Sequence, residues 1–333
     1  MCQMNDVGDE SYRAAARRLE IDAATAEMVT AFRAAGIRSI LLKGAAIAAR
    51  LYDEPNERPY CDFDLLVEPA RYTDAGEIAR GLGYRHELAG APTHERAAHA
   101  DAWQRGPVTL DLHHRVYWFR GDPDAMWDAF AAGAREIRVG ATEVMALSDA
   151  AQALVIAAHR VQHGPAAKGA RDLERAVSRF DREIWGQARD LARRLDMLGV
   201  LGVGLRTTTA GRALAIELEL PDEADLEMQI RLTGKRELID GLIRLRGAQS
   251  TSRAMQMLLC ELVPTPAFMR DKWRFARRGR RALIATYIYR PFHLAYHLPA
   301  GLSLLRATQR RQLQDGGLDA VALPHVQRVA RDA

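Results

Sequence analysis

The chain of 333 residues is long enough for two domains, and its 48% hydrophobic content is ample for a buried core. The formal net charge is only +4, so the overall charge does not favour nucleic acid as a partner. The three cysteines lack the spacing of metal ligands, and no apolar run reaches the roughly 18–20 residues that span a bilayer. Together with the polar, acidic residues 1–10, which are unlike a signal peptide, these features indicate a cytoplasmic protein without a disulfide framework.

The first part of the chain mixes short apolar runs with helical patterns. Apolar residues keep helical spacing from Leu19 and Ala23 to Val29 and Phe32, which predicts an amphipathic helix that ends at Gly36. The predicted elements are, in order, a helix over 11–35, a strand over 37–42, a helix over 45–52, a strand over 62–67, a helix over 72–82, a strand over 84–88, a mobile loop over 90–96, a hairpin of 99–105 with 107–116, a helix over 123–132 and a hairpin of 135–139 with 143–145.

From Ser148 onward the pattern is helical throughout. Ser148 is a plausible N-cap, and the predicted helices cover 151–161, 170–180, 184–198, 201–218, 223–232, 237–245 and 253–262, followed by a basic helical region kinked at Pro291 and Pro299. We therefore expect an α/β (α+β) protein. A small mixed-sheet domain with an N-terminal helix occupies 11–147, and an all-helical domain with a basic C-terminal region occupies 148–333.

Two short pieces carry the chemistry. Asp62 and Asp64 lie two residues apart in an apolar strand, so both carboxylates point to one face, where like charges repel unless a cation lies between them. Magnesium prefers carboxylate oxygens together with substrate phosphates. Upstream, an apolar strand ends at Lys43-Gly44 before a helix, and backbone N–H groups at such a turn bind phosphate. The two pieces together favour a metal–nucleotide site.

These residues resemble the nucleotidyltransferase superfamily typified by DNA polymerase β and the kanamycin nucleotidyltransferases. Within it, the chain is most similar to a group of bacterial proteins known as uncharacterised nucleotidyltransferases. The resemblance covers roughly residues 20–215. The matching positions are Lys43-Gly44, Tyr52, Arg58 and the run Asp62-Phe63-Asp64-Leu65-Leu66-Val67. One position departs from the pattern, because Ala45 follows Gly44 where the superfamily typically has Ser or Gly.

The resemblance implies a site and a reaction. The superfamily's third carboxylate corresponds to Asp111, so Asp62, Asp64 and Asp111 are the expected catalytic residues and ligands of Mg²⁺ or Mn²⁺, with Asp111 as the base. The expected reaction moves a nucleoside monophosphate from ATP or another nucleoside triphosphate to a hydroxyl or phosphate and releases pyrophosphate. The residues expected to contact the nucleotide are Lys43, Gly44, Ala45, Arg58 and His113.

Several residues keep a second interpretation. Arg58 either neutralises phosphate or pairs with a carboxylate, and Arg171-Asp172 is either a structural ion pair or part of the family's pattern. Asp111 with His113 also fits a hydrolytic metal centre, although His114 points away from them and further ligands are missing. His159 and His163 have helical zinc spacing, but Arg160 stands where a metalloprotease needs Glu, which favours a core or interface role.

The acceptor and the basic C-terminal region stay open. The acceptor is a small molecule, a peptide or a protein side chain, and nucleic acid is not expected. Residues 270–281 hold seven basic residues and one acid. This stretch either binds a polyanion, an acidic lipid or an acidic partner, or is a solvated helical face. The alternative function is a degenerate nucleotide-binding or adaptor protein that recruits a partner through its helical domain, with Ala45 as the mark of lost catalysis.

Overall fold

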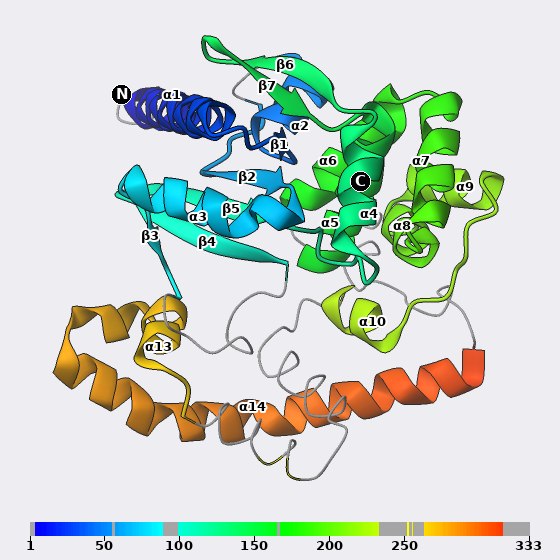
Figure 1. Ribbon diagram of the computed structural model, residues 1–333. Helices are drawn as coiled ribbons and strands as arrows, with labels where there is room; N and C mark the ends of the chain where they lie inside the picture. Colours follow the sequence, from blue (N-terminus) through cyan, green and yellow to red (C-terminus); the bar gives the residue numbers. More distant parts are fainter. Residues whose placement is uncertain are drawn as a thin grey trace. The chain divides into compact units, whose positions relative to one another are not determined.

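The computed structural model describes residues 4–54, 57–88, 99–164, 167–232, 252, 255 and 263–315 (Figure 1). The chain forms two compact units. The first consists of residues 1–156 with 172–197, and the second consists of 157–171 with 198–333. The domain boundary expected between residues 147 and 148 stays a prediction.

Within the described residues, seven strands form one mixed sheet in the order β3-β4-β5-β2-β1-β7-β6. The strands are β1 (Ser39–Leu41), β2 (Asp62–Val67), β3 (Arg85–His86), β4 (Ala100–Arg105), β5 (Val108–His113), β6 (Arg135–Val139) and β7 (Thr142–Ala146). β2 pairs in parallel with β5 and antiparallel with β1, and β1 pairs in parallel with β7. The predicted mixed α/β fold and both predicted hairpins are confirmed.

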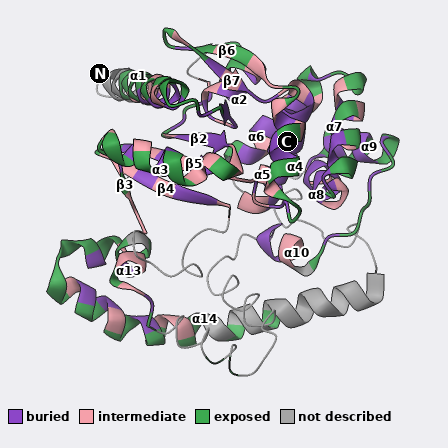
Figure 2. Ribbon diagram, in the orientation of Figure 1, coloured by how far each residue is buried: buried purple, intermediate pink, exposed green. Residues whose placement is uncertain are grey.

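The two central strands divide their side chains between two faces of the sheet. Phe63, Leu65 and Val67 of β2 enter a hydrophobic core, as do Leu110 and Leu112 of β5. α1 (Met4–Ala34) and α3 (Tyr72–Gly81) pack side chains into the same core (Figures 1 and 2). Because side chains alternate along a strand, the polar residues between them lie on the opposite face.

The buried stripe of α1 differs from the predicted one. The helix buries Ile21, Ala24, Met28 and Phe32, whereas Leu19 is 62% exposed. Ala23, also expected in the stripe, is exposed too. The spacing from Ile21 onward is still helical, so the period was predicted correctly and its phase was wrong at the N-terminal end.

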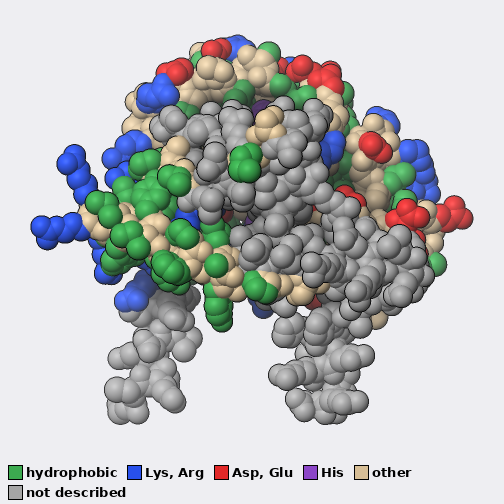
Figure 3. Space-filling view, turned by 90° about the horizontal axis from the view of Figure 1, so that it is seen from below, with side chains coloured by type: hydrophobic (Ala, Val, Ile, Leu, Met, Phe, Trp, Pro, Cys, Tyr) green, Lys and Arg blue, Asp and Glu red, His purple; other side chains and the backbone are tan. Residues whose placement is uncertain are grey.

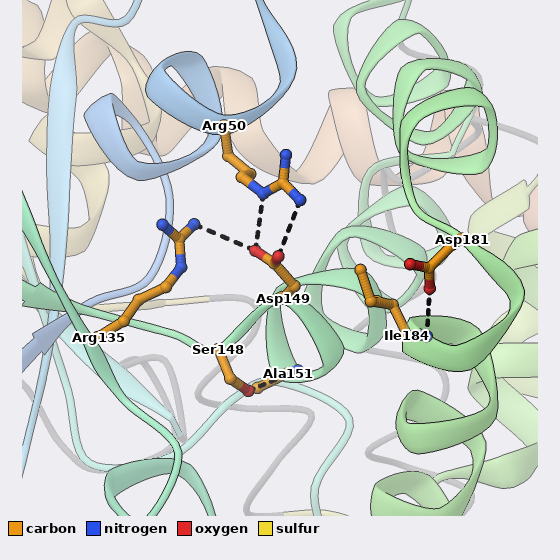
Figure 4. A network of polar contacts seen from close by, with 7 residues as sticks. All are labelled: Arg50, Arg135, Ser148, Asp149, Ala151, Asp181 and Ile184. Atoms are coloured by element: carbon orange, nitrogen blue, oxygen red, sulfur yellow. Dashed lines mark hydrogen bonds and ion pairs between the residues drawn. The ribbon is translucent and has the colours of Figure 1, made fainter.

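The remaining helices of the first unit are α2 (Ala45–Leu51), η1 (Pro69–Arg71), α4 (Pro123–Ala131), the beginning of α5 (Asp149–His163), most of α6 (Ala167–Arg179) and α7 (Arg182–Arg194). Ser148 caps α5 as predicted, since its Oγ accepts a hydrogen bond from Ala151 N at 3.2 Å. Asp149, the next residue, pairs with Arg50 of α2 at 2.9 Å and with Arg135 of β6 at 3.2 Å (Figure 4). The start of α5 is therefore tied to both α2 and the sheet.

Within its described residues the second unit contains helices and no strands, as predicted for this part of the chain. Besides the end of α5 and the start of α6, its described helices are α8 (Leu198–Leu205), α9 (Thr209–Glu217), α10 (Leu226–Leu232), α13 (Pro266–Lys272), η3 (Arg274–Arg278) and α14 (Arg280–Asp315). α14 contains both Pro291 and Pro299. No helix in the described ranges is long and apolar enough to cross a membrane.

Several predicted helix boundaries were wrong, and two of the errors have a local cause. The helix expected over 184–198 ends at Arg194, because Asp196 adopts a positive φ of 53°. The single helix expected over 201–218 is two, because Thr208 is extended and its side chain caps α9 by accepting from Gly211 N. The helices expected over 237–245 and 253–262 and the loop over 90–96 lie outside the described residues.

Candidate active site

The register of β2 and β5 places two carboxylates side by side. Asp64 is the direct partner of Asp111 in this parallel pair, and His113 follows two residues later on the same face of β5. One ligand atom from each of Asp64, Asp111 and His113 lies within 4.8 Å of the others. These three residues and Lys43 are called the Asp64 cluster below.

Asp64 is the centre of this cluster. Its Oδ1 lies 2.6 Å from Lys43 Nζ and 3.1 Å from His113 Nε2, and the residue is 3% exposed. Burial by itself would raise the pKa of Asp64, but the Lys43 charge and the His113 contact outweigh burial and hold the pKa well below its usual range. Asp64 is therefore a carboxylate at neutral pH.

The pKa values of Lys43 and Asp111 both depend on the charge of Asp64. Burial would lower the pKa of Lys43, yet the charges of Asp64, Asp111 and Asp62 raise it above its usual value. Burial and the neighbouring Asp64 charge raise the pKa of Asp111 to about 6. Lys43 alone does not balance the negative charge on this face of the sheet.

The donor set fits a divalent cation. Two carboxylates side by side suit Mg²⁺ or Mn²⁺, and a cation between them relieves the repulsion that raises the pKa of Asp111. His113 Nδ1 is buried and has no hydrogen-bond partner among the described residues. Asp62 lies on the same face at the start of β2, outside the 4.8 Å cluster, and its part in metal binding stays a prediction.

The turn at Gly44 leads directly from β1 into the site. Gly44 has φ 58° and ψ −117°, a conformation that favours glycine, and it is the N-cap of α2. Lys43 immediately before the turn reaches Asp64, while Ala45 begins the helix. The expected contacts of Lys43, Gly44 and Ala45 with phosphate stay predictions.

Arg58 is held by protein groups. Its Nε and Nη2 donate to the two carboxylate oxygens of Asp172 at 2.7 and 2.8 Å, and its Nη1 donates to Gly44 O at 3.1 Å. Tyr52 Oη donates to Asp172 Oδ1 at 2.7 Å. These contacts match the ion-pair interpretation of Arg58 and of Asp172. We call Tyr52, Arg58 and Asp172 the Arg58 cluster.

Sequence reasoning missed two aromatic neighbours of the site. The His99 ring lies 5.5 Å from the His113 ring and 5.0 Å from the Tyr117 ring, measured between centroids. Burial, with the nearby His113 and Lys43 charges, lowers the pKa of His99 to about 2, so its imidazole is neutral. In the hairpin of β4 and β5, Ala100 pairs with His113, which brings the adjacent His99 close to His113. The predicted hairpin of 99–105 with 107–116 was therefore the sequence signal that could have placed His99 beside the site.

α5 carries a pair of histidines with the spacing of zinc ligands. The rings of His159 and His163 are 4.2 Å apart, but within the described ranges neither joins a group of three possible metal ligands. The geometry adds nothing to a zinc interpretation, so the acidic face of β2 and β5 is the site that the structure favours.

The mixed sheet and its paired carboxylates are compatible with a nucleotidyltransferase, and comparison with known families shows that class. The chain belongs to the family described as "Uncharacterised nucleotidyltransferase", whose model matches residues 8–210, and it is an enzyme of the nucleotidyltransferase class. No curated protein matches the chain.

Two solved structures are similar at low sequence identity. The antibiotic-resistance factor ANT(2'')-Ia is 16% identical, with 53% of this chain and 94% of that chain covered and a TM-score of 0.39. The lincosamide antibiotic adenylyltransferase LnuA, bound to lincomycin, is 13% identical, with 46% and 94% covered and a TM-score of 0.32. The assignment of this chain rests on the family match.

Proposed function

We propose that this enzyme transfers a nucleoside monophosphate from ATP, or another nucleoside triphosphate, to a hydroxyl or phosphate of a small molecule, peptide or protein. The reaction depends on Mg²⁺ or Mn²⁺ and releases pyrophosphate. The observation that carries the proposal is the pairing of Asp64 with Asp111 on one sheet face, beside His113 and Lys43. This arrangement concentrates unbalanced negative charge where a metal–nucleotide complex supplies positive charge.

The proposed roles follow from the positions of the side chains. An acceptor oxygen attacks the α-phosphorus, the bond from that phosphorus to the oxygen bridging to the β-phosphate breaks, and pyrophosphate leaves. Asp111 takes the proton of a hydroxyl acceptor, a role proposed because its carboxylate lies directly beside Asp64 on the face that would hold the cation. Asp64 and Asp111, with Asp62, hold the divalent cation, which when bound stabilises the charge that develops on the phosphates.

Lys43 and the Gly44 turn are proposed to bind the triphosphate. Lys43 keeps its positive charge because three carboxylates raise its pKa, and it stands directly before the turn. The Arg58 cluster acts indirectly, because Arg58 Nη1 binds the carbonyl of Gly44 and so fixes the orientation of this turn.

The acceptor is proposed to be a single molecule and not a growing nucleic acid. Residues 37–68 contain four basic and six acidic side chains, which is unfavourable for a phosphodiester backbone. The basic residues are Arg38, Lys43, Arg50 and Arg58, and the acidic ones are Asp53, Glu54, Glu57, Asp62, Asp64 and Glu68.

The proposal is tested first by calorimetric titration of ATP into the protein in the presence of Mg²⁺. The protein is then incubated with labelled ATP, Mg²⁺ and a panel of acceptors. We expect metal-dependent ATP binding that Asp64→Asn and Asp111→Asn both weaken, while Asp74→Asn on α3 leaves it unchanged. Unchanged binding in both site variants would remove the metal assignment. ATP binding without pyrophosphate release from any acceptor would favour the degenerate nucleotide-binding alternative.

Oligonucleotides test the acceptor class separately. We expect no extended products when RNA or DNA is added with labelled ATP and Mg²⁺. A ladder of lengthened products, lost in Asp111→Asn, would show polymerisation and overturn the single-acceptor proposal without removing the metal site.

A further inference from the structure

The first half of α14 exposes apolar side chains on one face. Ile284, Ile288, Phe292 and Tyr296, each four residues apart, are 60, 64, 70 and 80% exposed. Tyr289 is 53% exposed, and Ala285 and Ala295 are exposed beside it. These seven residues are called the α14 apolar face.

The opposite side of the same helix is used for packing. Leu283 shares a small core with Met269 of α13 and Ala276 of η3, and Trp273 and Tyr287 pack against it. Thr286 and Arg290 are also buried on this side, and the Arg290 guanidinium lies 5.6 Å from the Phe268 ring centroid. The helix is therefore oriented by α13 and η3, and this orientation turns the apolar face outward.

Charge is absent from the apolar face and concentrated beside it. Between residues 282 and 296 the chain has one charged residue, Arg290, which is buried. The preceding segment, 270–281, runs from α13 through η3 to the first turn of α14, and all seven of its Lys and Arg side chains are exposed. Figure 3 shows hydrophobic side chains gathered toward the left of the view, with Lys and Arg side chains projecting at the left edge.

We propose that the α14 apolar face and the basic segment 270–281 together form a docking surface for an anionic lipid bilayer. Exposed single apolar residues are ordinary, but a contiguous apolar face marks an interaction site. The adjoining basic side chains complement anionic headgroups, and the apolar side chains enter the boundary between headgroups and acyl chains.

The composition of the face favours a bilayer over a partner helix. A helical partner is matched by aliphatic residues in a heptad pattern with charged residues flanking them. The α14 apolar face instead has Tyr289, Phe292 and Tyr296, with Pro291 among them and no flanking acid before residue 297. Tyrosine suits the lipid–water boundary, because its ring is apolar and its hydroxyl stays hydrated.

Vesicle sedimentation of the full chain tests this surface. We expect the protein to pellet with vesicles of phosphatidylcholine and phosphatidylglycerol, and at least about tenfold less with phosphatidylcholine alone. Added salt should reduce the bound fraction, because ions screen the basic segment. Failure to pellet with anionic vesicles, or equal and salt-independent binding to both kinds, would overturn the proposal.

Surface variants separate the two parts of the docking surface. The double variant Ile288→Ser with Phe292→Ser should lose about tenfold or more in vesicle binding. Ile216→Ser on α9, which is 66% exposed, is the matched apolar control and should bind as the parent does. Arg280→Glu with Arg281→Glu should weaken binding to anionic vesicles only, with Arg194→Glu of α7 as the charge control.

Circular dichroism and ATP titration are the controls, and they should show that each variant remains folded and keeps its nucleotide site. Unchanged vesicle binding in the Ile288/Phe292 double variant would overturn the proposal. So would concentration-dependent self-association that this variant abolishes in a chain that binds no vesicles, since a second copy would then cover the face.

Discussion

Two charge clusters, one buried and one partly buried, lie around the Gly44 turn, and they differ in how their charges are matched. In the Arg58 cluster one cation meets one anion, and Nε, Nη1 and Nη2 of Arg58 each have an acceptor. In the Asp64 cluster one ammonium, that of Lys43, faces the carboxylates of Asp64 and Asp111. Asp62 is also close enough for its charge to raise the pKa of Lys43.

The comparison separates structural charge from functional charge. A buried ion pair with matched partners requires no further ligand to balance its charge. Removal of either partner leaves the other as an uncompensated buried charge. A cluster with surplus negative charge costs folding free energy until a cation binds. The Arg58 cluster therefore stabilises the turn, whereas the surplus negative charge of the Asp64 cluster fits the metal site proposed above.

The largest expected effect is the loss of stability in Arg58→Ala. The change leaves Asp172 buried without its cation, so we expect a loss of about 3–5 kcal/mol in the free energy of unfolding. Denaturant unfolding measures it, and Arg38→Ala, at an exposed pair with Glu68, should cost no more than about 1 kcal/mol. The double variant Arg58→Met with Asp172→Leu should recover much of the loss. Equal stability of Arg58→Ala and the parent would contradict a structural role.

Asp64→Asn should instead act on turnover. Removing a proposed metal ligand should slow nucleotidyl transfer on the order of a hundred- to a thousandfold, which corresponds to about 3–4 kcal/mol in the barrier. Initial rates of pyrophosphate release measure the effect, and circular dichroism checks the fold. If Asp64→Asn kept its rate and lost only stability, the two clusters would not differ in the way proposed here.

The local parts of both clusters could be predicted from the sequence. The spacing of Asp62 and Asp64 predicts a shared strand face, and Gly44 after an apolar run predicts the turn, which its positive φ confirms. Asp111 came from family resemblance, because no local pattern shows that β5 pairs with β2 in parallel and in this register. The forty residues 68–107 separate the two strands along the chain.

The partners of the charged side chains were beyond sequence reasoning. Arg58 and Asp172 are 114 positions apart, and only the folded chain shows that they meet. Lys43 was expected at phosphate, and its ion pair with Asp64 depends on how the Gly44 turn redirects the backbone. The predicted phase of α1 was wrong because tertiary packing decides which side of the helix is buried. The break between α8 and α9 was not predicted because one capping residue, Thr208, decides it.

Gly44→Val tests the turn that lies between the two clusters. A β-branched residue at φ 58° and ψ −117° is strained, so we expect about 2–3 kcal/mol of lost stability. We also expect weaker ATP binding with adenosine binding less affected, because the turn is proposed to hold phosphate. Gly140→Val, at φ 59° in the β6–β7 hairpin, should cost similar stability and leave ATP affinity unchanged. Equal losses for ATP and adenosine would show that the turn does not bind phosphate.

The smallest expected effect is a gain in stability, at Asp111→Asn in metal-free protein. The gain is expected at Asp111 because Asp64 has Lys43 as its partner, whereas the charge of Asp64 disfavours ionised Asp111. A pKa raised from 3.8 to about 6 corresponds to roughly 3 kcal/mol at most, and partial solvation of this carboxyl lowers our expectation to about 1–2 kcal/mol.

The pH dependence gives this last prediction its sign. The folded protein binds the Asp111 proton more tightly than the unfolded chain does, so the parent loses stability as pH rises from about 4 to above 6. Asp111→Asn cannot ionise, so its advantage should be full above pH 6 and vanish below about pH 4. Unfolding with a chelator present measures this difference, and saturating Mn²⁺ should reverse it, because the parent then gains a ligand that the variant binds poorly. An advantage that grows as pH falls would mean that Asp111 is stabilised as a carboxylate, and the distinction between the two clusters would fail.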